Sequence, residues 1–240
     1  MNTSWIPRIV TPLALAAAIL VSFRAVPASR PVELAPGEPP PPSAAEMRAG
    51  LDVALAPGGP GIDRGATRAA VTVLEFADFG CRYCARFAAL AWPQLAREFV
   101  ATGLVRWKYV PFATGIFRNG DEAARAGECA AAQGRAAFAR MHDELYALQG
   151  EWQGSGDAAV AFRSLARVAG LDLGRFDACW ASAATAQRVR ATSTLADQLG
   201  VRATPTFFIN GQRVEGALPA DEFRYLLLEA LRASREAPSR

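Results

Sequence analysis

The chain has 240 residues, of which 51% are hydrophobic, so it can form one medium-sized domain with an ordinary core and additional segments. Its formal net charge of +3 is too small for a nucleic-acid-binding surface. The only histidine is His142, so a zinc site made of several imidazoles is excluded. We expect His142 to have a packing or capping role.

The first 28 residues have the pattern of an export signal. Residues 1–8 end in a positive charge, and residues 9–23 are mostly apolar. This apolar run suits the hydrophobic part of a signal peptide and is short for a membrane span. Val26 and Ala28 fit a cleavage site, and an uncleaved membrane anchor is the alternative. Both readings predict an extracytoplasmic location, in the periplasm or cell envelope.

Residues 29–65 are rich in proline, glycine and alanine. A segment of this composition buries too little apolar area to offset its ordering entropy, so we expect a semi-extended linker. Weak apolar spacing at 46–55 is compatible with one short helix.

The compact domain is expected over residues 66–235. Residues 70–76 (AVTVLEF) have the length and β-branched content of a buried strand. A helix is predicted from 81 to 100, with a kink at Pro93, and residues 103–112 read as a second strand.

A long helical block follows, and the strand pattern then returns. Helices are predicted at 121–149, 157–169, 173–179 and 181–199. Strands then flank Asn210-Gly211, which is a two-residue hairpin signal, and a final helix is predicted at 219–234. The order predicts an α/β fold in which a helical block, at about 118–199, is inserted into a small sheet domain.

Cys81 and Cys84 form a CxxC pair at the predicted junction between strand and helix. A sulfur at the start of a helix lies near free backbone N–H groups and the positive end of the helix dipole, and both favour thiolate. The spacing therefore indicates an exposed nucleophile, Cys81, and a shielded resolving thiol, Cys84, one turn deeper. Arg82 is expected to add a positive charge beside the nucleophile. Half of a zinc site and a structural disulfide are the alternative interpretations.

Four segments together resemble the DsbA-like thiol–disulfide oxidoreductases, which have a thioredoxin-like α/β fold with an inserted helical domain. These segments are LEFADFGCRYC, GLVRWKYVPF, AAQGRAAFARMHDELY and GVRATPTFFINGQRV, and the resemblance covers residues 66–235. It implies that Cys81 is the nucleophile, Cys84 the resolving cysteine and Pro205 a cis-proline facing them. A trans proline that opens a strand is the alternative.

The resemblance also implies roles for residues around the cysteines. Thr204, through its backbone, is expected to pair with an extended substrate, and Arg82 and Tyr83 are expected to contact substrate. Glu75 stands where the family often has a buried acid, and Lys108 is proposed as its charge partner in a proton shuttle for Cys84. A solvated glutamate and a surface lysine are the alternative.

Two further cysteines, Cys129 and Cys179, lie within the helical block. An exported chain with an even number of cysteines favours their pairing, and some DsbA relatives carry a second, non-catalytic disulfide across this insertion. Two buried free thiols are the alternative.

The predicted function is an exported thiol–disulfide oxidoreductase that introduces disulfides into reduced or unfolded exported proteins. We expect a monomer that needs neither cofactor nor metal, binds no nucleic acid, and is re-oxidised by a membrane protein linked to quinones. Arg82-Tyr83 is neither the Pro-His of strongly oxidising members nor the Gly-Pro of thioredoxins, so the reaction type is better defined than its direction. A reductase or isomerase, and a non-enzymatic binding module stapled by disulfides, are the alternatives.

Overall fold

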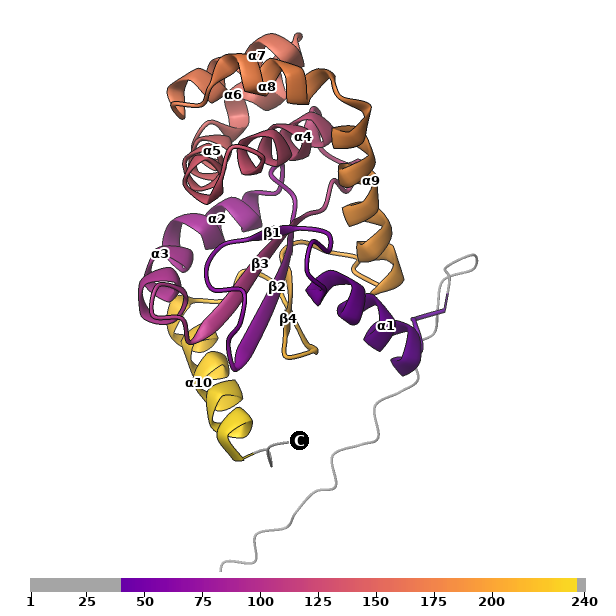
Figure 1. The fold of residues 1–240 in the computed structure, drawn as a ribbon, viewed down its shortest axis with the longest axis vertical. Coiled ribbons are helices and arrows are strands. Elements are labelled where there is room, and N and C mark those ends of the chain that lie inside the picture. Colours follow the sequence, from indigo (N-terminus) through magenta and orange to yellow (C-terminus); the bar gives the residue numbers. More distant parts are fainter. Residues whose placement is uncertain (1–39, 237–240) are drawn as a thin grey trace, which may run out of the picture. The chain divides into compact units, whose positions relative to one another are not determined.

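A five-stranded sheet with the strand order β1–β3–β2–β4–β5 lies at the centre of the protein. The structure, a computed structural model, describes residues 40–236 (Figure 1). Strand β2 (Val71–Ala77) is parallel to β3 (Val105–Pro111) and antiparallel to β4 (Thr206–Ile209). Strands β1 (Ile62–Asp63) and β5 (Gln212–Glu215) form the two edges. The α/β fold with an inserted helical block is therefore confirmed.

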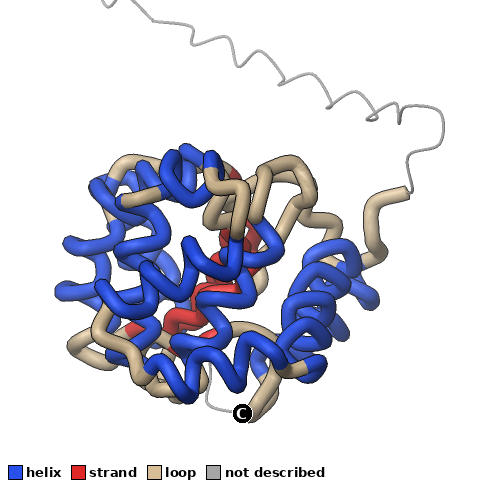
Figure 2. Tube along the Cα trace, turned by 90° about the horizontal axis from the view of Figure 1, so that it is seen from above, coloured by secondary structure: helices blue, strands red, loops and turns tan. Residues whose placement is uncertain are grey.

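Strands β2 and β3 are almost completely buried, because helices cover both faces of the sheet (Figure 2). Successive side chains of a strand point to opposite faces. Val73 therefore packs with Phe87, Leu95 and Phe223 on one face, whereas Leu74 packs with Leu195 and Leu199 on the other.

The predicted hairpin joins β4 to β5 through Asn210 and Gly211, both with positive φ values, 47° and 86°. The Asn210 side chain accepts a hydrogen bond from the backbone N–H of Thr72 at 2.8 Å. This contact ties the turn to the beginning of β2, so Asn210 both forms the hairpin and fixes its place on the sheet.

The predicted helix at 81–100 consists of three pieces. These are α2 (Arg82–Leu90), α3 (Trp92–Leu95) and a π-helical segment, η1 (Ala96–Val100). Pro93 lies in the first turn of α3, where its missing N–H breaks no helical hydrogen bond. The helix is interrupted at Ala91, two residues before Pro93, where the sequence predicts a kink.

The inserted block contains shorter helices than the sequence predicts. The expected helix at 121–149 is divided, because one helix ends at Ala131 and Gly134, with a φ of 117°, is the N-cap residue of the next. The helices of the block are α4 (Gly120–Ala131), α5 (Arg135–Ala147), α6 (Gln149–Gly154), α7 (Ala158–Val168), α8 (Leu173–Ala181) and α9 (Ala183–Gln198). The last helix, α10 (Ala220–Glu236), agrees with the expectation.

The packed region begins earlier than the predicted boundary at residue 66. Helix α1 (Ala44–Leu55) starts at a capping box formed by Ser43 and Glu46, and packs on α9. A Cβ atom added to Gly50 would lie 2.8 Å from Leu199, so the two helices are in close contact. With β1 paired to β3, residues 44–65 belong to the folded body and are not a free linker. The expected export signal and the rest of the linker lie outside the described residues.

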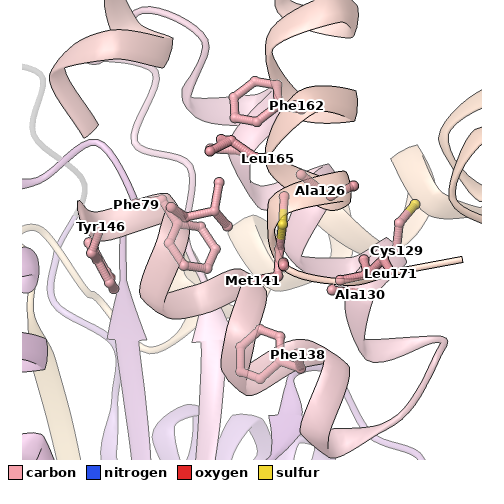
Figure 3. Packing of buried hydrophobic residues seen from close by; sticks show 14 of the residues in the cluster. Phe79, Ala126, Cys129, Ala130, Phe138, Met141, Tyr146, Phe162, Leu165 and Leu171 are labelled. Atoms are coloured by element: carbon pink, nitrogen blue, oxygen red, sulfur yellow. The ribbon is translucent and has the colours of Figure 1, made fainter. Parts of the chain in front are cut away.

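The helical block has its own apolar core, built around Phe138, Met141 and Phe162 (Figure 3). The same cluster continues through Phe79 to Cys81 and Cys84, so the block packs directly on the CxxC segment. Within residues 40–236, the structure contains no helix with the length and apolar character that a membrane span requires.

Candidate active site

The two cysteines of the CxxC motif lie where β2 ends and α2 begins. Cys81 is the N-cap residue of α2, and Cys84 lies in its first turn. Cys84 is 1% exposed, in agreement with the expected shielded thiol, whereas Cys81 is only 5% exposed and not the open nucleophile that the sequence predicts. The reason is the loop before β4, whose Thr204 carbonyl oxygen lies 3.3 Å from Cys81 Sγ.

The Thr204–Pro205 peptide bond is cis, as expected. Two hydrogen bonds fix the loop on either side of this bond. Thr206 Oγ1 donates to the Ala203 carbonyl at 2.7 Å, and Gly216 N donates to the Pro205 carbonyl at 2.8 Å. The loop that the resemblance assigns to substrate binding is therefore in direct contact with Cys81.

The pKa values of the two cysteines move in opposite directions, downward for Cys81 through hydrogen bonds and upward for Cys84 mainly through burial. Those from Cys84, from the Thr204 side chain and from the backbone N–H groups of Cys84 and Tyr83 lower the pKa of Cys81 to about 6, against the opposing effect of burial. Burial raises the pKa of Cys84 well above its usual value, and the hydrogen bond with Cys81 acts in the same direction. At neutral pH the pair therefore holds one thiolate on Cys81 and one thiol on Cys84.

Arg82 contributes differently from the expectation. Its side chain is exposed, and Nη2 donates to the Tyr83 hydroxyl at 3.0 Å while the guanidinium lies 4.8 Å from the Tyr83 ring centre. The causes of the low Cys81 pKa are hydrogen bonds, and Arg82 is not among them. Arg82 and Tyr83 thus form a cationic and aromatic pair on the surface beside the nucleophile.

Asp78 shapes the turn before Cys81, and the sequence analysis missed it. The carboxylate is 2% exposed and accepts hydrogen bonds from Gly80 N at 2.7 Å and from Thr114 N and Oγ1 at 2.8 Å. A Cβ atom added to Gly80 would lie 2.3 Å from Phe117, so this position requires glycine. An aspartate two residues before a glycine is a turn signal that was available in the sequence.

Two glutamines of α6 hold the same turn from the helical block. Gln149 Nε2 donates to the Phe79 carbonyl at 2.6 Å, and Gln153 Nε2 donates to the Gly80 carbonyl at 2.9 Å. These contacts fix the two peptide groups directly before Cys81. No local pattern could have indicated them, because the partners are separated by at least 70 residues.

Glu75 in β2 is buried, at 2% exposure, and Trp107 Nε1 donates to its Oε2 at 2.7 Å. Burial raises the pKa of Glu75 to about 7, although the charge of Arg64 and the Trp107 hydrogen bond act in the opposite direction. Burial raises the pKa of Tyr109 well above its usual value, and the charges of Glu75 and Cys84 act in the same direction. Glu75 and Cys84 therefore belong to one buried group of titratable side chains.

Lys108 is not the partner of Glu75, so this expectation is wrong. Lys108 is paired with Leu74 in the sheet, and so its side chain points to the face opposite to Glu75. Its Nζ donates to the carbonyls of Ala54 and Gly59, at 2.9 and 2.8 Å, where α1 ends. Lys108 therefore anchors α1 on the sheet.

The cation that faces Glu75 is Arg64, which directly follows β1 and which the sequence analysis missed. Its guanidinium lies 3.7 Å from the Trp92 ring centre, and Nη1 lies 3.1 Å from His142 Nε2. His142 is fully buried, and burial lowers its pKa to about 3, so it is a neutral packing residue as expected. The role of Arg64 was missed because this residue lies in the segment 29–65, which was interpreted as a linker.

Cys129 and Cys179 are joined by a disulfide. It links α4 to α8 and closes a sequence separation of 50 residues. Cys129 lies in the core of the helical block, whereas Cys81 and Cys84 are free thiols at the end of the sheet.

The comparisons with known proteins agree with this geometry. The sequence profile of the family described as thioredoxin matches residues 59–229. Alpha-DsbA1 of Wolbachia pipientis superposes with a TM-score of 0.63 at 18% identity, over 72% of this chain and 92% of that one. A thioredoxin-like oxidoreductase from Silicibacter pomeroyi has a TM-score of 0.59 at 25% identity, over 78% and 98% of the two chains.

Curated relatives with higher identity match over only part of their length. The Na(+)/H(+) antiporter NhaA 3 of Salinispora tropica is 36% identical over 175 residues, which are 73% of this chain and 25% of the antiporter. This chain thus spans about a quarter of the length of such relatives.

Proposed function

The chain belongs to the thioredoxin family and has a DsbA-like fold, and on this premise we propose that it is an exported thiol–disulfide oxidoreductase acting as a disulfide donor. The observation that supports the proposal is the opposite displacement of the two thiol pKa values, downward for Cys81 and upward for Cys84. A pair of this kind has one sulfur suited to leave as thiolate and one suited to hold a proton.

The proposed reaction begins with the Cys81–Cys84 disulfide. A substrate thiolate attacks Cys81 Sγ, the bond between Cys81 and Cys84 breaks, and Cys84 leaves and takes a proton. A second substrate thiolate then attacks the substrate sulfur of the mixed disulfide, and Cys81 leaves as thiolate. The substrate loses two electrons and gains a disulfide, while the CxxC pair is reduced to a dithiol.

Glu75 is suited to the proton transfer in the first step. Its pKa of about 7 allows it to give a proton to Cys84 when the disulfide opens, and to take it back when the disulfide reforms. The low pKa of Cys81 favours the second step, because a more acidic thiol is a better leaving group.

The low Cys81 pKa also supports the direction of the reaction. A thiolate stabilised at pH 7 stabilises the reduced pair, and a stable reduced pair makes the disulfide an oxidant. The proposed cycle therefore takes electrons from reduced exported proteins and passes them to a quinone-linked membrane protein. The protein would act outside the cytoplasm as a monomer.

The redox potential tests the direction. We expect equilibration of the full chain with glutathione to give a potential well above the roughly −270 mV of thioredoxin. A value near or below that of thioredoxin would refute the donor assignment and favour the reductase alternative.

Trapping experiments test the roles of the two cysteines. Cys84→Ser is expected to accumulate mixed disulfides when its Cys81 thiolate attacks disulfides of substrate proteins and releases one substrate thiolate, because the resolving sulfur that would free the partner is missing. Cys81→Ser is the matched control and should trap none. If Cys84→Ser also traps nothing, Cys81 is not the sulfur that exchanges with substrate and the proposed reaction is wrong.

A further inference from the structure

Three segments of the chain meet around Cys81. The first is the beginning of α2, which contains Cys81 as its N-cap residue. The second is the loop at 112–119, where Phe117 packs closely on Gly80. The third is the loop at 199–205, whose Thr204 carbonyl lies 3.3 Å from Cys81 Sγ. A polypeptide that brings a cysteine to Cys81 must pass over these segments.

These three segments carry positive charge without any carboxylate. Residues 79–91, 112–119 and 199–205 contain no aspartate or glutamate. They contain four arginines, all with exposed side chains, which we call the arginine rim: Arg82, Arg86, Arg118 and Arg202.

Carboxylates of neighbouring elements lie in the chain close to the rim, because Asp121 and Glu122 follow the 112–119 loop at the start of α4 and Glu151 lies in α6, but within the described residues none of these three forms an ion pair. Asp78 is buried and already accepts three hydrogen bonds, and Asp143 contacts His142 at 2.9 Å. Asp197 lies 3.7 Å from Arg202. Within the part of the chain that the structure describes, Arg82, Arg86 and Arg118 form no ion pair.

Apolar side chains accompany these charges. Tyr83, which directly follows Arg82, is 48% exposed, and Ile116, two residues before Arg118, is 79% exposed. Exposed apolar groups beside unpaired cations favour an unfolded polypeptide that carries both apolar and acidic side chains.

We propose that the arginine rim makes the protein prefer cysteines that are flanked by aspartate or glutamate in extended, reduced polypeptides. This inference rests on the proposed function and specifies its substrates. The rim raises the local concentration of acidic segments at Cys81 and orients them, and the thiol–disulfide exchange is the same for every substrate. Because the whole chain has a net charge of only +3, the attraction of acidic segments is expected from the arginine rim and not from the protein surface as a whole.

Three dithiol peptides that differ only in the residues flanking their cysteines, Glu, Gln or Lys, provide the test. Their rate of oxidation by the full-length oxidised protein is measured by stopped flow at low and high salt. At about 20 mM salt we expect the Glu peptide to react about tenfold faster than the Lys peptide. At about 0.5 M salt the ratio should fall to about twofold, because the charges are screened.

Charge reversal locates the effect. Arg86→Glu and Arg118→Glu are each expected to lower the Glu-to-Lys rate ratio by up to about fivefold, since exposed ion pairs contribute modest energies. Arg48→Glu, in the exposed part of α1, makes the same change in net charge away from Cys81 and should leave the ratio unchanged. Using the ratio within each variant corrects for any general loss of rate.

The outcomes separate the two proposals. Equal rates for the three peptides at low salt would overturn the substrate preference and leave the proposed function intact. An equal effect of Arg48→Glu and Arg118→Glu would also overturn it, because net charge alone would then explain the ratio. A wild-type protein that oxidises none of the peptides would instead refute the proposed function.

Discussion

The protein contains two pairs of cysteines, and the structure places them in opposite surroundings. Cys81 and Cys84 lie at the junction of β2 and α2, where free N–H groups of the helix and the Thr204 loop contact the sulfur. The disulfide between Cys129 and Cys179 joins two helices of the inserted block, with Cys129 in its apolar core (Figure 3) and Cys179 packed against it. The comparison shows that helical position and hydrogen bonding give a thiol its acidity, whereas two sulfurs placed between packed helices serve as a cross-link.

Removing each pair should have separate consequences, and these are the largest effects we expect. Cys81→Ser should abolish thiol–disulfide exchange and change the free energy of unfolding of the reduced protein by less than about 1 kcal/mol. The double variant Cys129→Ser/Cys179→Ser should lower that free energy by about 4 kcal/mol, because the loop of 50 residues is no longer closed in the unfolded chain. Chemical denaturation measures both values.

The pKa of Cys81 provides the control for the comparison. In the double variant the thiolate absorbance should still titrate near pH 6, because none of the groups that lower this pKa belongs to the disulfide. A Cys81 pKa restored to about 8.5 would show that the helical disulfide supports the CxxC site.

The variant Glu75→Gln tests whether the buried acid Glu75 takes part in exchange, in contrast to the buried acid Glu128 of the helical block. We expect single-turnover exchange near neutral pH to slow by about 100-fold, because Cys84 loses its proton donor and acceptor. The rate of the unsubstituted protein should show an inflection near pH 7 that the variant lacks, while alkylation of Cys81 still follows a pKa near 6.

The raised pKa of Glu75 also makes the free energy of unfolding depend on pH. Because the folded pKa of Glu75 lies above its unfolded value, its contribution to stability is fully present below about pH 4.3 and is lost as the pH rises through 7. Glu75→Gln should therefore flatten this part of the profile of unfolding free energy against pH.

Glu128 is a matched control for the effect of Glu75→Gln on the exchange rate, since burial also raises the pKa of Glu128 but this residue pairs with Arg188 in the helical block. If Glu128→Gln slowed exchange equally, a specific role of Glu75 would be excluded.

Two cations beside the sheet, the buried Lys108 and the partly buried Arg64, provide the comparison with the smallest expected effect. Lys108→Met leaves the carbonyls of Ala54 and Gly59 without a donor, so we expect a loss of about 1–3 kcal/mol in the free energy of unfolding. The pH profile of exchange should not change. Arg64→Met removes the charge that lowers the pKa of Glu75, and the inflection near pH 7 should move to higher pH. A shift caused by Lys108→Met would contradict the assignment of Lys108 to α1.

Local sequence patterns determined the features that depend on neighbouring residues. The CxxC spacing predicted a nucleophile at the start of a helix with a shielded thiol one turn below, and Asn210-Gly211 predicted the hairpin. The strand at 70–76 was predicted from its β-branched residues, and the family resemblance added Pro205. These signals are short-range, because a helix start, a tight turn or a strand is defined by a few consecutive residues.

Only the tertiary structure decided which distant side chains surround the cysteines. In the sheet, Lys108 is paired with Leu74 and not with Glu75. Because neighbouring residues of a strand point to opposite faces, the Lys108 side chain lies on the face opposite to Glu75. Arg64 reaches Glu75 because β1 returns along β3, and Gln149 reaches Phe79 because the inserted helices pack on the sheet. The physical reason is that burial, charge pairing and thiol coverage depend on contacts between segments far apart in the chain, for which a single sequence carries no local signal.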